Sequence, residues 1–140
     1  MRLLDNYIAG QWVPAGSNPK VLLDAVHGHE VAGADASNVD MASAFDYGRT
    51  VGSRNLRKMT FQQRGLMLKA LALYLMERKE TFYKWSAHTG ATRADAWVDV
   101  EGGIGTLFAY ASLRKQLPDL PYLVDGDPAL LSKGGTFIGH

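Results

Sequence analysis

The fold is decided by one stretch, residues 89–108, which reads TGATRADAWVDVEGGIGTLF. Thr92 can cap a helix that starts at the next residue, because its hydroxyl can accept a hydrogen bond from a first-turn amide. Asp95 places a negative charge in that turn, where the helix dipole favours it. An apolar stripe at helical spacing follows, formed by Trp97, Ile104, Phe108 and Ala111. The stretch therefore predicts a helix with one packed face.

A second face of this helix carries small and polar residues, namely Asp95, Asp99, Gly102, Gly103 and Thr106. A glycine inside a helix lowers the stability of the helix by about 1 kcal/mol relative to alanine. The presence of three glycines here therefore requires an explanation: Gly102, Gly103 and Gly105. One reason, which we favour, is the close approach of another backbone. The other is that this face lines a space that a side chain would block. Asp95 and Asp99 could form an acid–base pair, but a solvated acidic face is the simpler interpretation.

Two helices are expected directly before this one, after residue 60. Thr60 and Gln63 have the spacing of a capping box, and between residues 66 and 76 only Lys69 is polar. A helix that is apolar nearly all round must be buried on more than one side, which suggests packing against a larger body. A second helical stretch ends at Gly90. His88 lies near that end, where a cation is favoured, so we interpret it as structural.

The first third of the chain predicts short strands. Residues 7–8 and 12–13 flank a tight turn and suggest a hairpin, and residues 21–23 and 30–32 suggest two further strands. His27 and His29 lie in the turn between those strands. No cysteine or carboxylate cluster with ligand spacing accompanies them, so we expect solvated turn residues and no metal site.

Asp40 can cap a helix that runs to about Val51 and stops at Gly52. Its packed face would hold Met41, Ala44, Phe45 and Gly48. Residues 53–58 are then a basic connector, in which Arg54, Arg57 and Lys58 are a solvated surface rather than a phosphate site. Pro118 and Pro121 end the helical region. After them, strands are expected at residues 122–124, 130–132 and 136–138, with a turn at 125–128.

Composition narrows the class of protein. The chain has 140 residues, 46% of them hydrophobic and 21% charged, which fits one folded α/β unit. A net charge of +1 does not indicate binding to nucleic acid or to an anionic membrane. The start has no signal-peptide pattern and the longest apolar run is too short to span a bilayer, so a cytoplasmic protein is expected. There is no cysteine, which excludes disulfides and a cysteine nucleophile in these residues. No phosphate-binding loop or dinucleotide fingerprint occurs.

Several segments resemble the NAD(P)-dependent aldehyde dehydrogenases. Residues 7–16, YIAGQWVPAG, are similar to the N-terminal hairpin of that family, residues 28–32 to its next strands, and residues 59–64 to its early helices. Residues 89–99 and 102–108 are most similar to the dehydrogenase domain of the phenylacetic acid degradation bifunctional proteins. That group opens an oxepin-CoA ring and oxidises the resulting CoA-linked semialdehyde with NADP. A related group acts on a semialdehyde of the benzoyl-CoA pathway.

The resemblance covers all 140 residues here and about the first quarter of the family's dehydrogenase domain. It implies an α/β N-terminal portion in one unit, with β-hairpins at 1–36, packed helices at 38–115 and the start of a β arm at 120–140. It implies NADP or NAD as cofactor and a homo-oligomer, with the remainder of the dehydrogenase as partner. The family's catalytic cysteine, glutamate and asparagine have no counterpart here, so we assign no catalytic, cofactor-binding or metal-binding residue.

By the same analogy, four residues would border the substrate tunnel: Asp99, Gly102, Gly103 and Thr106. Two other classes of function stay open. The chain could be a non-catalytic helical interaction module that docks onto a partner chain, or a small free-standing binding domain.

Overall fold

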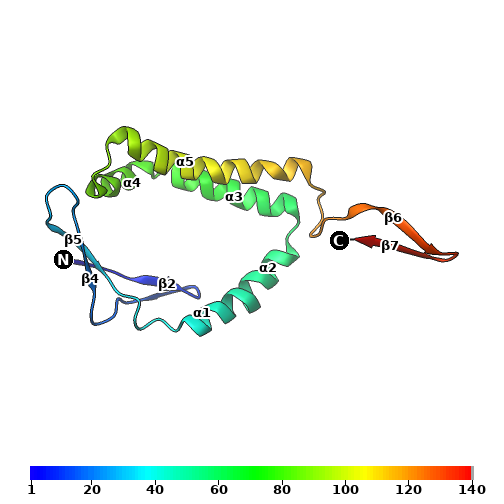
Figure 1. Cartoon of the computed structure of the whole chain (residues 1–140), viewed down its shortest axis with the longest axis horizontal. Helices are drawn as coiled ribbons and strands as arrows, with labels where there is room; N and C mark the ends of the chain where they lie inside the picture. The colour runs from blue at the N-terminus through cyan, green and yellow to red at the C-terminus, as the bar shows by residue number, and fades with distance from the viewer. Residues whose placement is uncertain (140) are drawn as a thin grey trace.

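The structure is a computed structural model that describes residues 1–139, without the side chains of residues 125, 128–129, 131–132 and 136–139. The chain is α/β, with short strands followed by packed helices, as predicted. Figure 1 shows an open frame: the N-terminal strands and the α1–α2 segment form one side, and α3, α4 and α5 form the other. A hairpin of β6 and β7 projects from the far end of that frame.

The N-terminal region contains two small sheets. The predicted hairpin is confirmed: β2 (Asn6–Ile8) pairs antiparallel with β3 (Gln11–Val13). Its two-residue turn places Ala9 and Gly10 at positive φ. The second sheet has the order β1–β5–β4, with β1 at Arg2–Leu4, β4 at Lys20–Leu23 and β5 at Glu30–Ala34. Strand β1 was not predicted, because within residues 1–139 it pairs with β5 alone, about thirty residues further along the chain.

The next helix is longer than predicted. Asp40 caps it as expected, accepting a hydrogen bond from the Ser43 amide at 3.1 Å. However, α1 (Met41–Tyr47) continues through a π-helical segment, η1 (Gly48–Gly52), into α2 (Ser53–Lys58). The predicted stop at Gly52 and the predicted connector after it are therefore wrong. Gly52 has a helical φ of −61°, whereas a glycine stop requires a left-handed one.

The expected packed face of α1 is also wrong, since Met41 and Phe45 are 53% and 77% exposed. No neighbouring element among residues 1–139 covers that side of the helix. The basic side chains of α2 are exposed, as expected: Arg54, Arg57 and Lys58.

Helices α3 (Phe61–Met76) and α5 (Arg93–Ser112) pack antiparallel and form the main helical contact. The capping box at the start of α3 is confirmed: the Gln63 amide donates to Thr60 Oγ1, and the Thr60 amide donates to Gln63 Oε1. The core between the helices is small and consists largely of Ala72, Ile104 and Ala111. Gly65 permits the contact, because a Cβ there would lie 2.9 Å from the Ala111 carbonyl oxygen.

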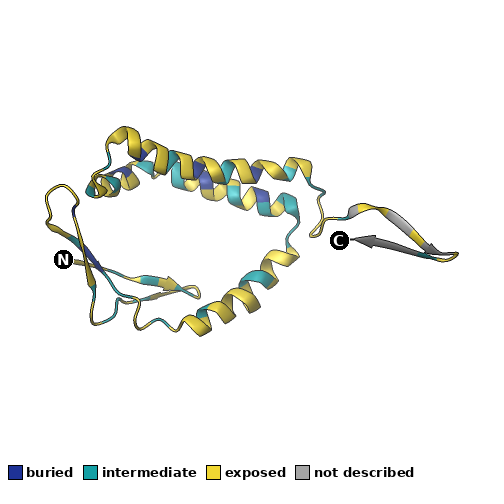
Figure 2. Cartoon of the chain, viewed as in Figure 1, coloured by how far each residue is buried: buried dark blue, intermediate teal, exposed yellow. Residues whose placement is uncertain are grey.

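Much apolar surface of α3 is left uncovered by the described residues, and the expected packing of this helix against a larger body stays a prediction. Five large side chains of α3 are about half exposed: Leu66, Met67, Leu71, Leu73 and Tyr74. Figure 2 shows mixed burial along α3 and mostly exposed residues on the outer side of α5. Trp97 is 57% exposed and does not join the predicted stripe, whereas Ile104 and Ala111 do.

A short helix, α4 (Lys79–Ser86), and a 3-10 turn, η2 (Ala87–Thr89), connect α3 to α5. Gly90, at φ +82°, ends this segment, and Thr92 caps α5, as predicted. After α5, η3 (Leu113–Gln116) completes the helical region before Pro118. No helix of residues 1–139 is long and apolar enough to cross a membrane.

The C-terminal part is one antiparallel hairpin of β6 (Asp125–Ser132) and β7 (Gly135–Gly139). The strands predicted at 130–132 and 136–138 lie within it. The predicted turn at 125–128 is wrong, because those residues belong to β6, where the register is irregular between Asp125 and Ala129. Gly126, at φ +81°, accommodates the irregularity. The strand predicted at residues 122–124 is wrong, because these residues precede β6 and form no strand.

Candidate functional site

The face of α5 that carries the glycines borders a shallow apolar groove of about 510 Å³. The groove is lined by Leu75 of α3, Phe82 of α4, and Asp99, Val100, Gly103, Ile104 and Leu107 of α5. Two of the four predicted tunnel residues, Asp99 and Gly103, therefore line it. Gly102 and Thr106 are exposed outside the groove, and the Thr106 hydroxyl donates to the Gly102 carbonyl oxygen at 3.1 Å.

The favoured explanation of the glycines, close approach of another backbone, is wrong among the described residues. A Cβ added at Gly102, Gly103 or Gly105 would meet no atom within 4 Å. The close approach is found at Gly65 instead. A weak signal for it exists in the sequence, since Gly65 and Ala72 are small residues seven apart in a helix where Ala70 is the one other small residue.

Asp95 and Asp99 do not form a pair in the structure. Thr92 Oγ1 donates to the Asp95 carboxylate at 2.6 Å, and the Asp95 amide donates back to the Thr92 hydroxyl. Asp95 therefore belongs to the helix cap. Among the described residues no hydrogen bond or ion pair links it to Asp99, which agrees with the simpler interpretation of a solvated acidic face.

A charged network fastens α4 to α5 beside this groove. Glu101 Oε1 accepts hydrogen bonds from Lys79 Nζ at 2.9 Å and from the Tyr83 hydroxyl at 2.7 Å. The hydrogen bond from Lys79, followed by that from Tyr83, lowers the pKa of Glu101. Burial, together with Glu101, raises the pKa of the Tyr83 hydroxyl. The network favours the ionised form of Glu101 and ties α4, the helix that carries Phe82, to α5.

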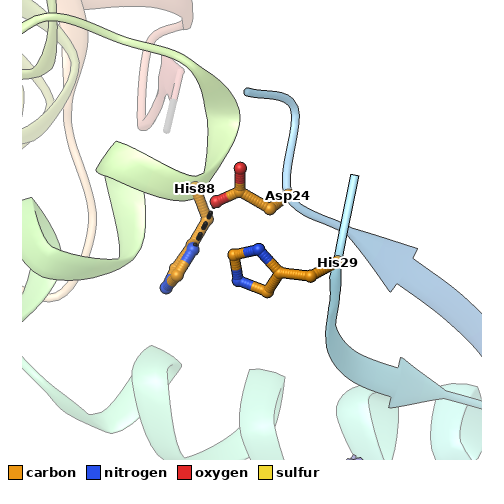
Figure 3. A group of neighbouring side chains, drawn as sticks. All are labelled: Asp24, His29 and His88. Atoms are coloured by element: carbon orange, nitrogen blue, oxygen red, sulfur yellow. Dashed lines mark hydrogen bonds and ion pairs between the residues drawn. The ribbon is translucent and has the colours of Figure 1, made fainter. Parts of the chain in front are cut away.

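A second cluster joins the sheet to the end of α4. It consists of Asp24, His29 and His88, which Figure 3 shows side by side. Asp24 directly follows β4 and is only 6% exposed. Its Oδ1 accepts hydrogen bonds from the amides of Val26 at 2.9 Å and His27 at 2.7 Å. Its Oδ2 lies 2.8 Å from His88 Nδ1.

These contacts strongly favour the charged carboxylate. The hydrogen bond from His88, followed by the backbone hydrogen bond from His27, holds the pKa of Asp24 far below its ordinary range, although burial acts in the opposite direction. The result is an ionised aspartate that links two parts of the chain 64 residues apart.

The sequence-based interpretation missed this cluster. His29 is exposed, but it is not an isolated turn residue, because one possible ligand atom each of Asp24, His29 and His88 lies within 4.8 Å of the others. His88 pairs with a carboxylate as well as lying near a helix end. His27 alone fits the expectation of a solvated residue, with 73% of its side chain exposed. Asp24 stands five residues before His29 in the sequence, and this carboxylate was the available signal.

Comparison with known proteins identifies the family. A profile of the aldehyde dehydrogenase family matches residues 12–124. Over 138 residues the chain is 32% identical to a 3,4-dehydroadipyl-CoA semialdehyde dehydrogenase of Aromatoleum evansii. That alignment takes in 98% of this chain and 27% of the relative, so the chain spans about a quarter of the relative's length. The resemblance found in the sequence is confirmed, and the chain belongs to the aldehyde dehydrogenase family.

Proposed function

We propose that this chain is the N-terminal part of a cytoplasmic, NAD(P)-dependent aldehyde dehydrogenase that oxidises a CoA-linked semialdehyde in the degradation of an aromatic compound such as phenylacetate. The observation that carries the proposal is the 32% identity, across almost the whole chain, to an enzyme whose name states such a substrate. NADP or NAD would supply the hydride acceptor. The chain has no cysteine, so a thiolate nucleophile would come from outside these residues.

Within such an enzyme, the α5 groove would border the tunnel through which the acyl chain reaches the reaction centre. Asp99 and Gly103 would lie at its wall, and Gly102 and Thr106 further round the same helix. The support is physical. Leu75, Phe82 and Leu107 make the groove apolar, and Gly103 leaves it open where a larger residue would project.

The exposed apolar residues of α3 indicate where the rest of the enzyme would pack. Leu66, Leu71 and Leu73 expose surface that a soluble protein normally covers. We propose that the remainder of the dehydrogenase packs there, that residues 1–140 form one unit with it, and that the β6–β7 hairpin contributes to contacts in a homo-oligomer.

A chimera tests the proposal directly. This chain would replace the aligned segment of the Aromatoleum evansii enzyme, and oxidation of the CoA semialdehyde would be measured with NADP and with NAD. The relative itself and a version without the segment are the controls. We expect the chimera to be active and the truncated version inactive. A chimera that folds and binds NADP but oxidises nothing would contradict the proposal.

The tunnel hypothesis has its own test in the same chimera. Gly103→Leu should raise KM for the CoA semialdehyde much more than for a small aldehyde, because only the larger substrate fills the groove. Gly105→Leu is the matched control: it is on the same helix and open to space, but it does not line the groove. Equal effects of Gly103→Leu on both substrates would refute the assignment.

The alternative is a non-catalytic module that docks onto a partner chain. The same exposed residues of α3 favour it. Such a module would bind the remainder of a dehydrogenase without restoring oxidation, so the inactive but folded chimera described above is the outcome that supports it.

A further inference from the structure

We propose that Asp24, His29 and His88 form a binding site for a divalent transition-metal ion of the zinc class, and that the bound ion fastens the β4–β5 turn to the end of α4. The site lies apart from the α5 groove and is independent of the proposed function.

The chemistry of the three side chains selects the ion. Two imidazoles and one carboxylate are ligands typical of Zn²⁺, and also of Ni²⁺ and Cu²⁺. Mg²⁺ and Ca²⁺ prefer sites made of oxygen atoms. The ligands come from two distant segments, with Asp24 and His29 on either side of one turn and His88 in η2.

The two oxygens of Asp24 have different surroundings. Oδ1 accepts from the amides of Val26 and His27 and lies 3.2 Å from His27 Nδ1. Oδ2 has only the contact with His88 Nδ1 among the hydrogen bonds of the described residues. Oδ1 therefore orients the carboxylate, while Oδ2 keeps a lone pair for a cation.

The main chain holds the three residues together without help from a ligand. The Asp24 amide donates to the His29 carbonyl oxygen at 2.8 Å, and the Ala25 amide donates to the His88 carbonyl oxygen at 2.9 Å. A site that is already assembled binds more tightly than one that must be ordered on binding.

The distances between the three ligand atoms are close to those that a tetrahedral zinc ion needs. Ligand atoms about 2 Å from a tetrahedral zinc ion lie roughly 3.3 Å apart. Here the three atoms lie within 4.8 Å of one another, a gap that side-chain rotation of the exposed His29 can close. The His88 side chain is 39% exposed, so the ion can enter from solvent and a water can fill the fourth position. Binding replaces the hydrogen bond between His88 Nδ1 and Asp24 Oδ2 with two bonds to the ion, and the proton shared in that hydrogen bond is released to solvent.

Zinc titration of the chelator-treated, desalted protein by isothermal calorimetry tests the site, with Mg²⁺ as the comparison ion. We expect saturable 1:1 binding of Zn²⁺ and no binding of Mg²⁺. His29→Gln and His88→Gln should each weaken the affinity for Zn²⁺ about 10-fold or more. His27→Gln is the matched control, because it removes an imidazole from the same turn, and it should leave the affinity within about 3-fold.

Several outcomes would overturn the proposal: no saturable binding of Zn²⁺, wild-type affinity in His29→Gln and His88→Gln, or an equal loss in His27→Gln. The last would place the ion on exposed turn histidines instead. Far-UV circular dichroism checks the folding of each variant. If His88→Gln does not fold, His29→Gln decides the question, because no side-chain hydrogen bond of His29 is present among the described residues to be lost.

Discussion

The crossing of α3 and α5 at Gly65 leads to a quantitative prediction about two alanine substitutions. In a helix interior, glycine to alanine adds about 1 kcal/mol of stability when nothing opposes it. At Gly103 nothing lies within 4 Å of the new methyl group, so Gly103→Ala should give that full gain. At Gly65 the methyl group would lie 2.8 Å from Arg114 Cβ and 2.9 Å from the Ala111 carbonyl oxygen. Overpacking of this kind costs about 1–3 kcal/mol.

The two variants should therefore differ by about 1–3 kcal/mol in the free energy of unfolding. Gly65→Ala should be neutral to about 2 kcal/mol less stable than the wild type, since the helix-propensity gain offsets part of the overpacking. Urea unfolding followed by circular dichroism measures this as a shift in midpoint at constant slope. Gly105→Ala, at another open position, is a second control and should behave like Gly103→Ala. If Gly65→Ala stabilises the protein as much as Gly103→Ala, the helices do not approach each other at residue 65 and the packing argument fails.

Two further predictions concern the core and the cluster between the sheet and α4. Ile104→Ala, at a position 5% exposed, should lower the free energy of unfolding by about 2–5 kcal/mol. Trp97→Ala, at a 57% exposed position, should cost clearly less in the same urea assay, and a larger loss at Trp97 would refute the burial assigned to α5. The pKa of Asp24 is lower in the folded protein, so its contribution to stability is complete above its ordinary pKa of about 3.9 and falls as the pH drops below it. Asp24→Asn should therefore flatten the decline of the urea midpoint below about pH 4, and an unchanged decline would contradict the role of the His88 contact.

Local signals in the sequence predicted much of the fold. The caps at Asp40, Thr60 and Thr92 are all present, because a cap depends on a side chain and an amide only three residues apart. The β2–β3 hairpin and the β4 and β5 strands were also found from short patterns.

The wrong predictions occur where one local sequence pattern is compatible with two different structures. Gly52 can end a helix or continue one, and only its φ angle decides between them. Gly126 likewise suggests a turn, but a bulge within β6 uses the same left-handed φ. Trp97 has the correct spacing for the core, but no neighbouring element among the described residues covers it.

The amino-acid sequence by itself determined the class of the protein. Residue-level similarity, above all in the hairpin at 7–16 and the glycine-bearing stretch at 89–108, carried the resemblance to the aldehyde dehydrogenase family, and the family profile matches residues 12–124. The sequence alone also shows that these residues contain no cysteine, which excludes a cysteine nucleophile among them.

Only the tertiary structure decided which residues meet across long separations. The contact of Asp24 with His88 spans 64 residues, and the packing of Gly65 against Ala111 depends on how two helices cross. The weak signals that the sequence carries for these two contacts do not fix them, because each contact depends on how separate elements pack against one another. The apolar groove beside Gly103 arises in the same way, from three helices that each contribute part of its wall.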